Sequence, residues 1–174
     1  AQDMILGLYY ITLELDGEKG EGGVYGDIAE IEHAMHADKL SIHAKIKCLR
    51  KKLMHDGSMQ NIMVDTTPGR VILSEVLPKD ASIGFDLINR LMTKKEVAKL
   101  ISQVYNHCGP KQTVLFVDHI MQLGFRFACT AGISMGKDDM VVPPTKPKLL
   151  AEFDEEVRRY ENQYADGLIT TGER

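Results

Sequence analysis

One narrow apolar stripe near the C-terminus constrains the fold of this chain more than any other feature. Its side chains recur at steps of four, four, three, four and four residues: Leu149, Phe153, Val157, Tyr160, Tyr164 and Leu168. The spacing predicts a helix that starts from Thr145, with Pro147 in its first turn and charged residues on its other faces. A stripe this narrow normally packs against one antiparallel helix, so the sequence predicts a helical hairpin.

The residues after this helix supply only the beginning of the expected partner. The run 165–167 (Ala-Asp-Gly) is typical of a helix end. Thr170 and Glu173 then fit a capping box, in which Thr170 accepts the Glu173 backbone N–H and the Glu173 side chain bonds back to Thr170. Because the sequence starts at Ala1 and stops at Arg174, we expect a piece of a longer protein; the alternative is a polar tail.

Length and composition exclude several classes of protein. The 174 residues correspond to about one domain, and 44% apolar with 26% charged residues is typical of a globular chain. Lys+Arg 21 against Asp+Glu 25 gives a net charge of -4, which argues against a stand-alone DNA-binding protein. The scattered Cys48, Cys108 and Cys129 indicate reduced, cytosolic thiols. No apolar run approaches the roughly 20 residues that span a bilayer.

The first half of the sequence mixes helical and strand patterns. Asp3 is expected to cap a helix over 4–11 that is apolar nearly all round and therefore buried on every side. The glycine-rich run 16–23 lacks the spacing of a phosphate-binding loop and predicts a flexible turn. Asp27 is expected to cap a short helix that contains Ile28, Ile31 and Met35.

A hairpin and a turn are expected next. Alternation over 41–49 predicts a half-buried strand, the run 56–57 (Asp-Gly) predicts a hairpin turn, and 61–64 is the returning strand. The run 68–69 (Pro-Gly) predicts a turn before further apolar residues up to 77. A second capping box, Thr93 with Glu96, starts a helix that ends at 108–110, and another helix follows over 112–131. The pattern predicts an α+β fold: a small antiparallel strand region, then a helical region and a protruding C-terminal helix.

Candidate chemical sites are few. His33, His36 and His43 are three histidines that could hold zinc, although nothing in the spacing fixes their geometry. Asp138 and Asp139 could bind Mg²⁺, but such a pair more often forms a helix cap or a solvated turn. Five cations within 45–52 are most simply a solvated strand face, with phosphate or an acidic partner as the alternative. The sequence therefore predicts no convincing active site.

Several short blocks along the chain form one recognisable pattern: 2–10 (QDMILGLYY), 19–22 (KGEG), 67–70 (TPGR), 94–96 (KKE), 124–125 (GF), 131–134 (AGIS), 138–143 (DDMVVP), 163–164 (QY), 167–170 (GLIT) and 172–174 (GER). With these blocks the sequence resembles the bacterial DNA-directed RNA polymerase β′ subunit, and the resemblance spans all 174 residues. It implies a pore-like α+β region over 1–92, a helical funnel region over 93–144 and a truncated rim-helix hairpin over 145–174.

The resemblance also implies a function. In the family this stretch lines the secondary channel, through which nucleotides enter and the RNA 3′ end is extruded, and its rim is where transcript-cleavage factors dock. The NADFDGD loop that binds the catalytic Mg²⁺ is absent from this sequence, so no catalytic residue, cofactor or metal ligand is assigned to it. The implied partners are the β, α and ω subunits, the rest of β′, DNA, RNA and secondary-channel factors. The implied location is the bacterial cytoplasm, in association with the nucleoid and not with a membrane.

Two sets of site residues follow from the resemblance alone. In some bacterial polymerases the alarmone ppGpp binds through a Lys, an Ile, an Asp and a Tyr, and the matching positions here are Lys111, Leu115, Asp118 and Gln122. Gln122 in place of an aromatic residue removes stacking worth about 1–3 kcal/mol. Charges expected on the factor-docking rim are Glu155, Arg158 and Glu173.

Two other classes of protein stay open at this point. One is an autonomous cytosolic binding module that dimerises through the C-terminal helix. The other is a small metalloenzyme built on the three histidines, which would require stoichiometric zinc.

Overall fold

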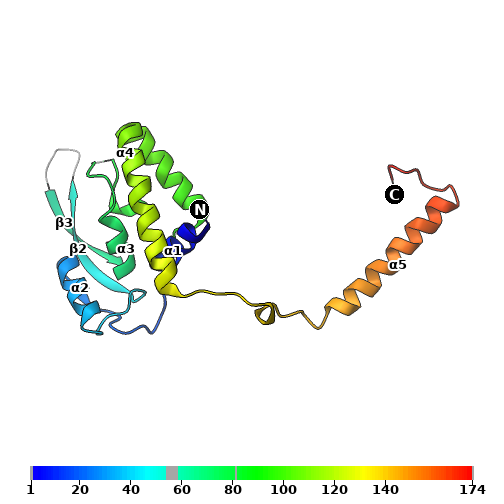
Figure 1. Ribbon diagram of the computed structural model, residues 1–174, viewed down its shortest axis with the longest axis horizontal. Helices are drawn as coiled ribbons and strands as arrows, with labels where there is room; N and C mark the ends of the chain where they lie inside the picture. Colours follow the sequence, from blue (N-terminus) through cyan, green and yellow to red (C-terminus); the bar gives the residue numbers. More distant parts are fainter. Residues whose placement is uncertain (1, 54–58, 81, 174) are drawn as a thin grey trace. The chain divides into compact units, whose positions relative to one another are not determined.

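The computed structural model describes residues 2–53, 59–80 and 82–173. The chain forms two compact units, 1–133 and 134–174, and each is treated by itself. The first contains α1 (Gln2–Thr12), β1 (Val24–Tyr25), α2 (Ile28–His36), β2 (Ile46–Leu53), β3 (Met59–Thr66), α3 (Pro68–Ser74), a 3-10 turn (Phe85–Leu87) and α4 (Lys94–Ala131) (Figure 1). The second contains a 3-10 turn (Lys137–Asp139) and α5 (Lys146–Ala165). The predicted α+β class is confirmed.

The sheet has the order β1-β2-β3. β2 and β3 pair in antiparallel register from Ile46 opposite Thr66 onward, while β1 pairs with β2 in parallel. The predicted returning strand is thus confirmed, and the predicted Asp-Gly turn lies outside the described residues. β2 starts at Ile46, five residues later than expected, because the chain before it turns: the Ala44 N–H bonds to the Ser41 carbonyl, and the His43 carbonyl accepts from the Leu15 N–H.

The inner face of the sheet packs on α2 and α3. Ile46 and Cys48 point into a cluster with Ile31 of α2 and Val71 of α3, and all four are at most 2% exposed. The predicted cap of α2 is confirmed, since the Asp27 side chain accepts the Glu30 N–H.

The Pro-Gly run at 68–69 is the first turn of a helix, so the predicted turn was wrong. Thr67 caps α3 by accepting the Arg70 N–H at 3.3 Å, and Pro68 occupies the first turn, where its missing N–H costs nothing. Val71 and Leu73 are buried on this helix and belong to two different clusters.

The long helix α4 is broken near its middle, as predicted. Gly109 has φ 75° and ψ 175°, and Pro110 follows it, so the chain changes direction between two helical segments (Figure 1). Thr93 makes no side-chain cap bond; its own N–H bonds to the Leu91 carbonyl, and the Glu96 carboxylate lies 3.4 Å from Arg90. The start of the helix was predicted correctly and the capping box was not.

The main core lies where α1 packs against α4 (Figure 1). Its buried side chains come from α1, α3, the segment before α4 and both parts of α4: Leu8, Leu73, Ile83, Ile88, Met92, Val97, Leu100, Val104, Phe116 and Ile120. α1 starts at Gln2, so Asp3 lies within the helix and does not cap it. Leu6 and Tyr9 are 36% and 39% exposed, so the expected burial on every side was wrong.

None of the described helices is both long and apolar enough to cross a membrane.

Candidate functional site

The second half of α4 presents one exposed stripe of side chains. Lys111, Leu115, Asp118 and Gln122 lie at positions i, i+4, i+7 and i+11 of the helix, and all four are exposed. On the opposite side, Phe116 and other buried side chains hold the helix against the core. The fold therefore brings together the four residues that the resemblance assigned to the alarmone.

The polar groups of this stripe are partly engaged with one another. Gln122 Nε2 donates to Asp118 Oδ2 at 2.8 Å, one helical turn away. Leu115 is 48% exposed between Lys111 and this pair, and Val114 beside it is 68% exposed. The stripe thus offers a cation, an apolar patch and a carboxylate that already accepts one hydrogen bond. Such a set can bind a ligand through its charges and its apolar patch.

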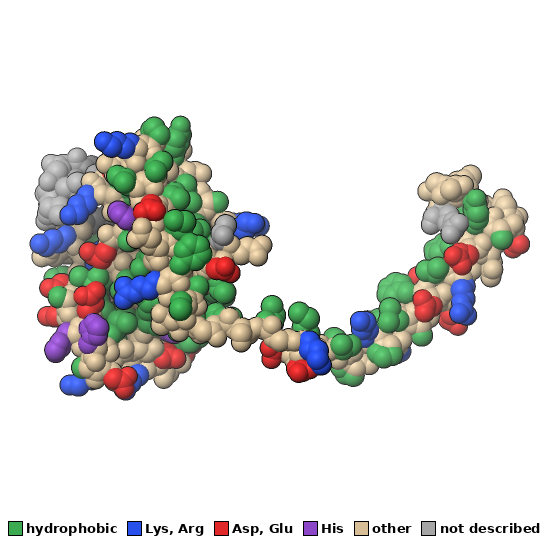
Figure 2. Space-filling model, in the orientation of Figure 1, with side chains coloured by type: hydrophobic (Ala, Val, Ile, Leu, Met, Phe, Trp, Pro, Cys, Tyr) green, Lys and Arg blue, Asp and Glu red, His purple; other side chains and the backbone are tan. Residues whose placement is uncertain are grey.

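In the second unit, α5 bears the predicted apolar stripe on its surface. Five of its members lie within the helix and are 38–61% exposed: Leu149, Phe153, Val157, Tyr160 and Tyr164. Leu168 lies beyond the end of α5 and is 73% exposed. Hydrophobic side chains gather along one edge of the helix (Figure 2). The helix is confirmed, and Thr145 precedes it without a side-chain cap bond.

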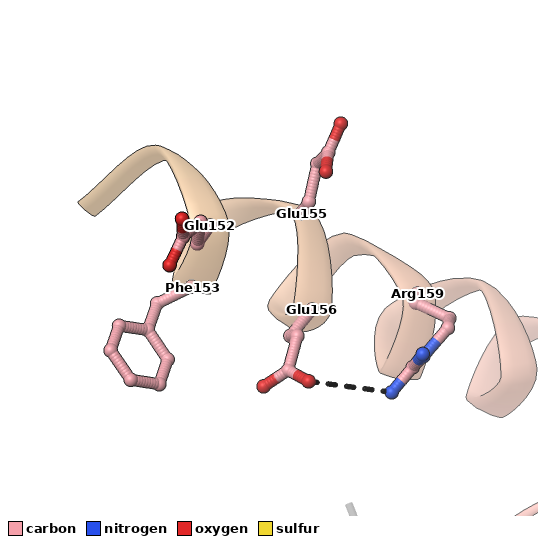
Figure 3. A pocket seen from close by; sticks show the side chains of 5 residues that line it. All are labelled: Glu152, Phe153, Glu155, Glu156 and Arg159. Atoms are coloured by element: carbon pink, nitrogen blue, oxygen red, sulfur yellow. Dashed lines mark ion pairs between the residues drawn. The ribbon is translucent and has the colours of Figure 1, made fainter. Parts of the chain in front are cut away.

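Charged residues flank this stripe. A shallow hollow beside Phe153 is lined by Glu152, Glu155, Glu156 and Arg159, and Glu156 pairs with Arg159 at 3.6 Å (Figure 3). Glu155 points away from Phe153 (Figure 3). At 100° per residue Arg158 also lies on the side of the helix opposite Phe153. A helix covering the stripe would therefore leave the two predicted rim charges, Glu155 and Arg158, exposed.

The capping-box residues at the end of the chain form half of the predicted arrangement. Glu173 Oε2 accepts the Thr170 N–H at 2.9 Å, as expected, and also the Thr170 hydroxyl at 2.8 Å. The hydroxyl is a donor here, so the Glu173 N–H bonds to the Thr170 carbonyl instead, and the residues form a turn. The hydrogen bond from the Thr170 N–H lowers the pKa of Glu173 most, and the hydrogen bond from the Thr170 hydroxyl lowers it further.

The three histidines do not form one group. His43 is 7% exposed; its Nδ1 lies 3.2 Å from the Leu13 carbonyl oxygen, and its ring packs edge-on against Tyr10. His33 and His36 are exposed on α2. Within residues 2–53, 59–80 and 82–173, no group of three or more His, Cys, Asp or Glu side chains could hold a metal ion.

The remaining charged motifs take part in local contacts. Lys45 pairs with Glu14 and Asp16, which raises its pKa mainly through the hydrogen bond to Asp16. Asp139 accepts the Gly136 N–H at 2.7 Å, so the acidic pair forms the capped turn that was the simpler expectation. Arg50 is different, because it lies beside a hollow formed with β3 and residues 74–80 and 83–86. No local motif predicts this hollow, since its parts are distant in sequence.

Comparison with known families identifies the class of protein. The family model for RNA polymerase Rpb1, domain 3, matches residues 1–140, which include every helix and strand of the first unit. The chain therefore belongs to this family. It is part of the largest subunit of DNA-directed RNA polymerase, a nucleotidyltransferase that transcribes DNA together with other subunits. The resemblance is confirmed at this level.

Proposed function

We propose that the chain is part of the β′ subunit of a bacterial RNA polymerase and forms part of the wall and rim of the secondary channel. The observation that carries this proposal is the family match over residues 1–140. The run 138–143 (DDMVVP) and the α5 stripe support the bacterial assignment, because both fit the β′ pattern given above. The subunit would then act in the bacterial cytoplasm, associated with the nucleoid.

Catalysis in this proposal is performed elsewhere in the enzyme. The described residues provide no cluster of ligands for Mg²⁺, and the sequence lacks the NADFDGD loop. The β, α and ω subunits and the rest of β′ would supply the metal site and the grip on DNA and RNA. The chain's own net charge of -4 fits a surface that does not hold the nucleic acid backbone itself. Purified alone, it should therefore show no template-directed RNA synthesis.

The rim assignment rests on α5. The exposed apolar stripe offers a surface for a partner helix. Glu155 points away from Phe153 (Figure 3), and helix geometry places Arg158 opposite Phe153 as well, where a docking factor could reach both. The alarmone assignment rests on the exposed stripe of Lys111, Asp118 and Gln122 on α4. Both are surfaces for binding.

The experiment uses the intact polymerase that contains this chain. Charge reversal by Arg158→Glu should reduce factor-stimulated transcript cleavage and leave factor-free elongation unchanged, since only docking is altered. Lys95→Glu is the matched control, because Lys95 is an exposed cation on α4 that has no ion-pair partner among the described residues. Equal cleavage by Arg158→Glu and wild type across factor concentrations would refute the rim assignment. Robust RNA synthesis by the chain alone would refute the proposal that catalysis is performed elsewhere in the enzyme.

A further inference from the structure

The inner face of the β2–β3 hairpin continues past the core that covers it. Cys48 lies opposite Val64 and is fully buried, whereas Arg50 lies opposite Ile62 and both are only partly buried. A hollow of about 410 Å³ opens at this point, between the hairpin and residues 74–80 and 83–86. Its apolar lining includes Ile62, Val64, Leu77, Ile83 and Phe85. A volume of this size accommodates one or two large side chains of a ligand.

Arg50 is held in a fixed orientation at the edge of this hollow. Its Nη2 donates to Ser74 Oγ at 2.7 Å, and its guanidinium carbon lies 5.0 Å from the centre of the Phe85 ring. Nη1 is 3.8 Å from Glu75 Oε1, an ion-pair distance too long for a hydrogen bond. The side chain is only 22% exposed. Most of its five N–H groups thus remain available to an acceptor that enters the hollow.

The hollow is lined by three cations, Arg50, Lys51 and Lys79, and by three carboxylates, Glu75, Asp80 and Asp86. Glu75 already faces Arg50, the Asp80 carboxylate accepts the Ser82 N–H at 2.8 Å, and Asp86 also interacts within the fold. Lys79, by contrast, has no carboxylate within ion-pair distance in the part of the chain that the structure describes. Lys79 and the remaining N–H groups of Arg50 are therefore donors at this hollow that a carboxylate of a ligand could reach.

The backbone beside the hollow can bind a peptide. β3 is an edge strand of the described sheet, and an edge strand points alternate N–H and C=O groups outward. Asn89 Nδ2 donates to the Asp65 carbonyl at 2.9 Å, which leaves the stretch nearer Ile62 as the open part of the edge. Met63 on this stretch is 51% exposed. An edge strand beside a side-chain pocket is the arrangement by which domains add a peptide strand.

We propose that this hollow and the edge of β3 bind an extended peptide segment of another polypeptide, which adds a strand to the sheet. An apolar side chain of the peptide fills the hollow against Ile62 and Phe85. A carboxylate two residues along the peptide, and hence on the same face, pairs with Lys79 and Arg50. Its residues are different from those of the α4 and α5 stripes.

The test uses the full chain with isotope-labelled Ile and Val methyl groups and the acetylated, amidated peptide Thr-Phe-Thr-Glu-Thr. Titration followed by NMR should shift the Ile62, Val64 and Ile83 methyl signals in a saturable way and leave Val157 of α5 unchanged. N-methylation of the peptide backbone should abolish these shifts, because it removes the main-chain donors. The small molecule 3-phenylpropionate should bind more weakly, since it cannot pair with β3.

A charge exchange tests the carboxylate contact without depending on stability. Lys79→Gln should weaken binding of the Glu peptide about fivefold, the effect of losing one ion pair of about 1 kcal/mol. Lys95→Gln, which removes an equally exposed cation from α4, should leave binding unchanged. Lys79→Glu should reverse the preference, so that the peptide with Lys in place of Glu binds better.

Absent shifts at Ile62 and Val64, or full binding by the N-methylated peptide, would overturn the proposal. The proposal would also be overturned if Lys79→Glu still preferred the Glu peptide to the Lys peptide, or if 3-phenylpropionate bound as tightly as the peptide.

Discussion

Gly7 of α1 and Gly124 of α4 lie where the two helices cross, with their backbones in direct contact. A β-carbon built on Gly7 would collide with the Gly124 carbonyl oxygen, and one on Gly124 would lie 2.5 Å from the Met4 carbonyl oxygen. Neither glycine has a positive φ, so the requirement is for space. Gly124 lies within the second helical segment of α4 and lets α1 approach it closely.

Replacing Gly7 with Ala should therefore destabilise the first unit. Helix propensity alone would favour Ala by about 1 kcal/mol, but the backbone atoms that the methyl group meets cannot move without separating the helices. We expect a net loss of about 1–3 kcal/mol in the free energy of unfolding, measured by urea denaturation. Gly84→Ala is the control, because its β-carbon has no neighbour closer than 4.0 Å; a loss as large there would contradict the explanation.

Two buried threonines should respond in opposite directions to replacement by Val. Thr12 Oγ1 donates to the Leu8 carbonyl at 2.7 Å and accepts the Met92 N–H at 2.9 Å, so Thr12→Val leaves that N–H without a partner. The expected loss is about 1–3 kcal/mol. Thr66 Oγ1 is buried with no hydrogen-bond partner in the described structure, so Thr66→Val should be neutral or stabilising by about 1 kcal/mol. Urea denaturation measures the free energy of unfolding of both variants. Equal losses would contradict the explanation that Thr12 satisfies a buried N–H and Thr66 does not.

The sequence predicted those features that depend on neighbouring residues. The Asp27 cap, the break at Gly109 and the α5 stripe each follow from a short motif, and all are present. The features it missed depend on distant contacts. Pro68 begins a helix because α3 fits between the sheet and α1, where a β-carbon on Gly69 would collide with the Ile11 backbone.

The same distinction applies to the candidate sites. The α4 stripe could be placed from sequence because one helix carries Lys111 through Gln122. The hollow beside Arg50 could not, because Arg50, Ser74 and Phe85 meet only after the hairpin has packed on α3 and the following loop. The charge of Arg50 suggested a solvated strand face, and its packing against Phe85 shows a different environment.

The three cysteines should react in the order of their exposure. Cys129 is exposed, Cys108 is partly buried and Cys48 is fully buried. Burial raises the pKa of both the Cys48 and the Cys108 thiols, which disfavours the reactive thiolate. Iodoacetamide treatment followed by peptide mass spectrometry should therefore label Cys129 first, Cys108 next and Cys48 only on unfolding. Early labelling of Cys48 would contradict the packing of the sheet on α2 and α3.

The raised pKa of Cys48 also gives a pH dependence with a definite sign. The folded state favours the neutral thiol, so its contribution to stability is fully present below the unfolded pKa of 9.0 and is lost as pH rises from there through the folded pKa. Between about pH 8 and pH 10.5, the free energy of unfolding should fall less steeply in Cys48→Ala than in wild type. Parallel slopes would exclude this contribution.

Glu173 should titrate below the ordinary range of glutamate. Its carboxylate accepts both the N–H and the hydroxyl of Thr170, so the folded pKa is lowered. The contact is present above the ordinary glutamate pKa and is lost as pH falls through the lowered value. The Thr170 amide signal in NMR should report this midpoint, and it should lie below that of a blocked glutamate peptide. Glu173→Gln should abolish the transition; its persistence would assign the signal to another group.

Gln122→Tyr should strengthen alarmone binding by the intact polymerase if the α4 stripe binds ppGpp as proposed. The substitution frees Asp118 Oδ2 from its 2.8 Å bond to Gln122 and adds an aromatic ring beside exposed Leu115. Stacking worth about 1–3 kcal/mol corresponds to about 5- to 150-fold in affinity, measured by filter binding of labelled ppGpp. Lys111→Ala should weaken binding, because it removes a cation that can pair with phosphate. Gln112→Tyr, exposed on another side of α4, should have no effect. Equal gains in affinity from Gln122→Tyr and Gln112→Tyr would show that the ring acts through general hydrophobicity. That result would refute the proposal that the α4 stripe is the binding site.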